Sequence, residues 1–168
     1  MRKKKSFNIH ATCVRLERAA DAFGAPPDAG VLLLGKSGAG KSDLALRLIA
    51  AGATLVADDC CELFVSRRRL FARAPARLRG LIEVRGVGII KLPHAPHAWV
   101  ALAVEHAPTA PRLSVHRRFE PPAGLLLPAK MAPPVIKLAL FEASAAAKVV
   151  AATAAYAHAL HRDDINPI

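Results

Sequence analysis

The chain has 168 residues, 53% of them hydrophobic, and this length suits one compact domain with a buried core. No apolar run reaches the roughly 20 residues that span a bilayer, and the basic residues 1–5 lack the apolar segment of a secretion signal. We therefore expect a cytoplasmic protein with no membrane partner. The formal charge of +11 favours polyanionic ligands, but the basic residues are scattered and only 5% of residues are aromatic, so a nucleic acid partner is unlikely.

The pattern along the chain predicts an α/β domain with a mixed sheet over residues 9–168, preceded by a basic tip over 1–8. In the first half of the chain we expect an extended stretch over 9–14, a loop over 22–28, a strand over 31–34, a helix from about 40 to 51 capped by Gly52, and a strand over 54–57. A hairpin of 62–65 and 69–72 follows, and the segments 82–85 and 88–90 flank Gly86, which indicates a sharp loop or bulge in place of a continuous strand. The remainder should contain a strand over 99–104, irregular or edge-like pieces between prolines from 108 to 143, and a closing helix from Ser144 to about 160.

The most informative motif follows the first buried strand and precedes the first helix. It has the form G-x-x-x-x-G-K-S and consists of Gly35, Lys36, Ser37, Gly38, Ala39, Gly40, Lys41 and Ser42. Its glycines let successive backbone N–H groups turn toward phosphate oxygens, and the helix start adds its positive dipole end. Lys41 would reach the β- and γ-phosphates, and the Ser42 hydroxyl would bind Mg²⁺. The alternative, a glycine-rich turn without a ligand, does not explain why the whole motif stands in its strand–loop–helix setting.

Two adjacent carboxylates, Asp58 and Asp59, follow the strand over 54–57. Ends of strands are where α/β proteins gather ligand groups. Adjacent side chains point in different directions, so one carboxylate can serve the metal while the other faces the acceptor. The plainer alternative is a turn that ends the strand.

Three further residues are weaker candidates when they are taken alone. Glu83 and Arg85 lie at alternate positions, so they share one side of an extended backbone. Glu83 could help to bind Mg²⁺ while Arg85 neutralises phosphate charge, or the two could form a surface ion pair. His10 stands near a strand, where a structural histidine is the commoner case. The three cysteines, Cys13 and the adjacent Cys60 and Cys61, are predicted to be reduced packing residues, because neither their spacing nor a paired histidine motif indicates a metal site.

Together, the segments Ile9-His10-Ala11, Gly35 to Ser42, Leu55 to Asp59 and Ile82 to Ile90 resemble the HPr kinase/phosphorylase family. The segment with Glu83-x-Arg85-Gly86-x-Gly88-Ile89 is the most specific, because it is similar to that family's signature. The resemblance implies a phosphoenolpyruvate carboxykinase-like fold that uses ATP and Mg²⁺ to phosphorylate a serine of the phosphocarrier HPr, a component of the phosphotransferase system, and that can reverse the reaction by phosphorolysis.

The resemblance also implies roles for individual residues. Lys41 and the loop would hold the phosphates, Ser42 and Glu83 would serve the metal, and Asp59 would be the proton acceptor, with Asp58 beside it. His10 and Arg112 match an active-site histidine and a later catalytic arginine. The hexameric assembly of longer relatives makes a homo-oligomer plausible by analogy.

The sequence departs from the family in three places. The loop begins at Gly35, so the chain looks like a short form without the family's N-terminal domain, and the segment 17–28 is longer than expected. The family's later Pro-x-Arg-x-Gly-x-Asn loop, tied to phosphorolysis, has no counterpart in residues 126–131. We therefore expect kinase activity to be retained in preference to phosphorylase activity. The main alternative is an ATP-binding sensor with impaired catalysis, and a small-molecule kinase is a third reading that leaves 83–90 unexplained.

Overall fold

The structure is a computed structural model that describes residues 5–112 and 117–161, with side chains to 157. Its strands are β1 (Ser6–His10), β2 (Thr12–Arg15), β3 (Ala29–Leu34), β4 (Thr54–Ala57), β5 (Cys60–Ser66), β6 (Arg69–Arg73), β7 (Leu81–Val84), β8 (Gly88–Lys91), β9 (Ala98–His106), β10 (Arg117–Arg118) and β11 (Pro134–Leu138). The helices are α1 (Lys41–Ala50) and α2 (Ala145–His161), with 3₁₀ turns η1 (Glu17–Phe23), η2 (Ala76–Leu78) and η3 (Ala129–Met131).

The main sheet is mixed, as the sequence predicts, and runs in the order β1-β5-β6-β9-β3-β2-β4. Its centre is β9, which pairs in parallel with β3 and β11 and antiparallel with β6. Strand β3 is buried on both faces, as apolar strands in such sheets are: Val31 and Leu33 join one core cluster and Leu32 the other. Because the strand is buried on both faces, it holds the start of the loop after Leu34 in a defined position.

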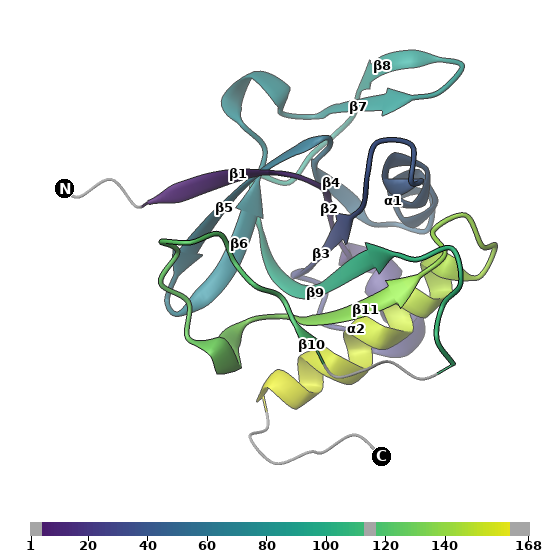
Figure 1. The fold of residues 1–168 in the computed structure, drawn as a ribbon. Coiled ribbons are helices and arrows are strands. Elements are labelled where there is room, and N and C mark those ends of the chain that lie inside the picture. The colour runs from purple at the N-terminus through teal and green to yellow at the C-terminus, as the bar shows by residue number, and fades with distance from the viewer. Residues whose placement is uncertain (1–4, 113–116, 162–168) are drawn as a thin grey trace.

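Helices cover one face of this sheet. The core on that side contains Leu44 and Leu48 of α1 and Val149 of α2, and Figure 1 shows α2 lying along β9 and β11. The hairpin β7–β8 forms a separate two-stranded sheet that extends beyond the main sheet, above α1 (Figure 1). Among the described residues, no helix combines the length and apolarity needed to cross a membrane.

Two expectations are corrected in detail. The stretch predicted to be extended over 9–14 is divided between β1 and β2, which pair with different neighbours on either side of Ala11. The proline-rich region contains the strand β11, most of it buried and parallel to β9. Pro134 opens that strand, where a missing N–H is tolerated, so the prolines did not prevent a ladder.

Glu62 on β5 forms hydrogen bonds with side chains on both neighbouring strands, β1 and β6. Arg73 on β6 donates to both of its carboxylate oxygens at 2.8 Å, and Ser6 on β1 donates at 2.5 Å. The bonds from Arg73 and Ser6 lower the pKa of this carboxyl to about 2.

This pKa shift predicts a pH-dependent stability. A Glu pKa below its unfolded value of about 4.3 stabilises the fold above that pH, and the stabilisation is lost as pH falls toward 2. Glu62→Gln should lower the free energy of unfolding by about 1–2 kcal/mol at pH 7, with the partial exposure of the Glu62 and Arg73 side chains limiting the effect, and by much less near pH 2. Urea titrations across pH would measure this, with the exposed Glu120→Gln as the control. Equal losses at pH 7 and pH 2 would contradict it.

Candidate active site

A pocket of about 320 Å³ opens where the loop before α1, the end of β4 and the hairpin β7–β8 meet. Its lining includes most of the predicted site residues: His10, Ser37, Gly38, Gly40, Lys41, Ser42, Asp58, Asp59, Glu83 and Arg85. It also includes Thr12, Asp43, Leu46, Val84 and Phe141, which the sequence did not single out. Arg112 is exposed and does not line this pocket.

The glycines of the loop adopt backbone conformations that favour glycine. Gly38 has φ of 81° and Gly40 has φ of 96°, and Gly40 caps the start of α1. A β-carbon on Gly38 would also lie 3.3 Å from the Arg85 guanidinium. Gly38 and Gly40 also line the pocket and have no side chains of their own, so a phosphate chain could approach the backbone N–H groups there.

Lys41 lies almost entirely inside the protein and is bonded to its own loop. Its ammonium donates to the carbonyl oxygens of Gly35 at 2.7 Å and Lys36 at 3.0 Å, and it lies 3.0 Å from Nε2 of His10. Burial lowers the pKa of Lys41, while Asp59 and Asp58 oppose this shift. The two carboxylates therefore favour the charged form that phosphate binding uses.

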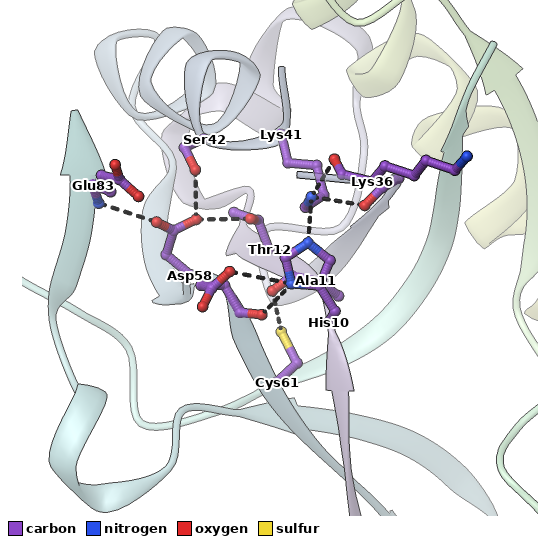
Figure 2. A network of polar contacts seen from close by, with 11 residues as sticks. His10, Ala11, Thr12, Lys36, Lys41, Ser42, Asp58, Cys61 and Glu83 are labelled. Carbon is purple, nitrogen blue, oxygen red and sulfur yellow. Dashed lines mark hydrogen bonds and ion pairs between the residues drawn. The ribbon is translucent and has the colours of Figure 1, made fainter. Parts of the chain in front are cut away.

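The two adjacent aspartates have different surroundings. Asp58 is only 5% exposed, and its Oδ1 accepts hydrogen bonds from Thr12 at 2.7 Å and Ser42 at 2.8 Å. Its Oδ2 accepts from the backbone N–H of Glu83 at 3.1 Å, so the carboxylate ties the loop, β2 and the hairpin together (Figure 2). These contacts place the Asp58 oxygens beside the Ser42 hydroxyl, a pairing of oxygen groups suited to Mg²⁺.

Asp59, in contrast, has a side chain that is 79% exposed. Its φ of 63° is a left-handed conformation that is uncommon outside glycine and that turns the chain sharply between β4 and β5. One of its carboxylate oxygens lies 3.1 Å from Nδ1 of His10, and its carbonyl oxygen lies 3.0 Å from the same atom.

His10 thus bridges Lys41 and Asp59. Figure 2 shows its contact with Lys41. The Lys41 ammonium can only donate, so Nε2 of His10 accepts and the ring proton lies on Nδ1, from which it is donated to Asp59. In this arrangement His10 orients the exposed carboxylate of Asp59. His10 lies on the edge strand β1, far from the loop in sequence.

The hairpin brings Glu83 and Arg85 to the pocket, as predicted, with a turn at Gly86 between its strands. Within the described part of the chain no ion pair joins these two side chains, so they do not form the surface pair considered as an alternative. The cysteines are free thiols, and burial raises the pKa of Cys13 to about 12, which fits inert packing residues.

Thr12 and Phe141 could hardly be found from the sequence alone. Thr12 is two residues after His10 and would share its side of a continuous strand, but only the fold shows that it donates to Asp58. Phe141 follows a proline-rich stretch, with no spacing that relates it to the loop.

Comparison with known proteins now identifies the segment that carries most of this site. Residues 25–96 match the family model of the HPr Serine kinase C-terminal domain. This match covers less than half of the chain, and over it the chain is similar to that domain. The matched segment contains the loop, both aspartates and the hairpin, whereas His10, Arg112 and Phe141 lie outside it.

Curated proteins with a corresponding name are similar over part of the chain. The HPr kinase/phosphorylase of Leptothrix cholodnii is 53% identical over 64 residues, which are 38% of this chain and 20% of the relative. That of Neisseria meningitidis is 50% identical over 66 residues, which are 39% of this chain and 21% of the relative. The matched part thus spans only about a fifth of these relatives.

A solved structure extends the likeness of fold to nearly the whole chain. The Hpr(Ser) kinase/phosphatase from Coxiella burnetii superimposes with a TM-score of 0.67 over 94% of this chain and 99% of that one. The two are 22% identical, so the comparison shows the shared mixed α/β fold.

Proposed function

We propose that this chain is an ATP- and Mg²⁺-dependent protein serine kinase that phosphorylates an HPr-type phosphocarrier of a phosphotransferase system in the cytoplasm. The observation that carries the proposal is the division between the two aspartates. Asp58 is buried and bonded to the Ser42 hydroxyl, whereas Asp59 is exposed at the pocket and oriented by His10. A site for transfer to a protein hydroxyl needs both a fixed metal ligand and an accessible base.

The residues present fit the nucleotide and the metal. The open glycine loop and the buried ammonium of Lys41 suit a triphosphate, and the oxygens of Ser42, Asp58 and Glu83 are the donors that Mg²⁺ prefers. Bound Mg²⁺ would supply neutralising charge for the β- and γ-phosphate oxygens. Lys41 and Arg85 would add positive charge from the protein.

In the proposed transfer, Asp59 accepts the proton of the acceptor serine hydroxyl. The serine oxygen forms a bond to the γ-phosphorus as the bond to the β–γ bridging oxygen breaks, which leaves ADP and a phosphoserine. His10, through its Nδ1–H, holds the Asp59 carboxylate in place. The base is exposed, so a side chain on the surface of another protein can reach it.

The proposal is tested with the chain, γ-labelled ATP, Mg²⁺ and an HPr-type carrier. We expect one phosphoryl group on a carrier serine, located by mass spectrometry. ATP binding without transfer would overturn the kinase proposal and favour the sensor alternative. We also expect little pyrophosphate release from the phosphorylated carrier and inorganic phosphate, since residues 126–131 lack the loop associated with phosphorolysis.

A further inference from the structure

Three large apolar side chains line the pocket and have no role in the transfer described above. They are those of Leu46 on α1, Val84 on β7 and Phe141 in the loop between β11 and α2. The Phe141 side chain is 63% exposed although its neighbour Leu140 is fully buried. A large aromatic ring left exposed beside a ligand pocket is available for a ligand to cover.

The loop that carries Phe141 is fixed to the phosphate-binding helix. Arg47 on α1 donates from Nη1 to the carbonyl oxygen of Glu142 at 2.8 Å and from Nη2 to that of Leu140. The ring of Phe141 also lies against Gly40, where an added β-carbon would be 3.0 Å from it. The bonds from Arg47 and the packing against Gly40 therefore keep the Phe141 ring next to the glycine loop, although it is far from that loop in sequence.

These apolar side chains are separate from the residues proposed to act on the γ-phosphate. This separation indicates which part of a nucleotide they would contact. Asp59 and His10, which serve the γ-phosphate, line the same pocket as Lys41. Backbone groups of such a loop hold the α- and β-phosphates, so the nucleoside extends away from the reacting phosphate. Leu46 lies one helical turn after Ser42 and Asp43 and also lines the pocket, so apolar surface adjoins the residues that follow the loop.

We propose that Phe141 is the stacking platform for the nucleobase, with Leu46 and Val84 as the surrounding apolar wall. This inference rests on the proposed function, since it assigns the base-binding part of the same site. Leu46 and Val84 have no hydrogen-bonding side-chain groups, and Asp43 beside them is paired with Arg47 at 2.8 Å. Stacking on a ring does not distinguish one base from another, so ATP and GTP are expected to bind with similar affinity.

The test compares nucleotide with a ligand that lacks the base. Phe141→Ala should weaken the binding of ATP and of GTP by about ten- to a hundredfold, while the affinity for inorganic tripolyphosphate stays within about twofold. Phe141→Trp should retain ATP binding, and its fluorescence should change with ATP but not with tripolyphosphate. Phe23→Ala, at an exposed phenylalanine outside the pocket, is the matched control.

The outcomes separate this inference from the proposed function. If the parent protein binds ATP and Phe141→Ala binds it equally well, the platform is overturned and the kinase proposal stands. Equal weakening of ATP and tripolyphosphate would also overturn it, because the ring would then act through the loop rather than on the base. If the parent binds neither ligand, the proposed function fails and the platform fails with it.

Discussion

Asp59→Asn should lower the rate of phosphoryl transfer to the carrier by about 100- to 10,000-fold while ATP binding stays within about threefold of the parent. The amide cannot accept the serine proton, but it has nearly the same shape as the carboxylate. The side chain is 79% exposed, so the fold should not depend on it. Initial rates with labelled ATP, together with calorimetric titration of ATP, measure the two effects separately.

The matched control for Asp59→Asn is Asp21→Asn, which makes the same chemical change at an exposed position outside the pocket. That variant should transfer phosphate at the parent rate. If Asp59→Asn also does so, the proton is taken by another group and Asp59 is not the base.

Asp58→Asn should differ from Asp59→Asn, because we expect it to lower both the stability of the fold and the Mg²⁺-dependent binding of nucleotide. Its Oδ1 accepts from two hydroxyls and its Oδ2 from the Glu83 N–H, so an amide must set an N–H group against at least one donor. Leaving buried donors such as the Thr12 hydroxyl without acceptors costs about 1–3 kcal/mol each. We expect a fall of about that size in the free energy of unfolding and ATP binding that no longer increases with Mg²⁺.

Urea unfolding of Asp58→Asn and Asp59→Asn under the same conditions compares their free energies of unfolding directly. Asp59→Asn should lie within about 0.5 kcal/mol of the parent, as exposed substitutions do. If Asp58→Asn is as stable as Asp59→Asn and keeps its Mg²⁺ response, the assignment of Asp58 as a buried ligand is wrong.

The phosphate-binding loop and its setting could be predicted because the information is local. Gly38 and Gly40 are needed where the backbone has positive φ, and a strand and a helix adjoin the loop in sequence. The paired aspartates and the sharp change of direction at Gly86 were also predicted from short patterns. These features need no knowledge of which strands pair.

The rest of the site depends on contacts between distant segments. Thr12 is 46 residues from Asp58, and Arg47 contacts the carbonyl oxygen of Glu142 across 95 residues. The spacing of residues in a single sequence does not record such pairs. The strand β11 was missed for a related reason, since its partner β9 ends 28 residues before it begins. Prolines there suggested irregular structure, and tertiary pairing overrode that tendency.

The separation of the molecule into two hydrogen-bonded sheets has a consequence for how the site is held together. Glu83 belongs to the small sheet and Arg85 to the turn between its two strands, whereas the loop and the aspartates adjoin strands of the large sheet. Ile82, almost fully buried, anchors the hairpin, and the bond from the Glu83 N–H to Asp58 links it to the bottom of the pocket. Asp58 is therefore the residue through which the phosphate-binding loop and the hairpin are joined by hydrogen bonds, one from Ser42 and one from the Glu83 N–H.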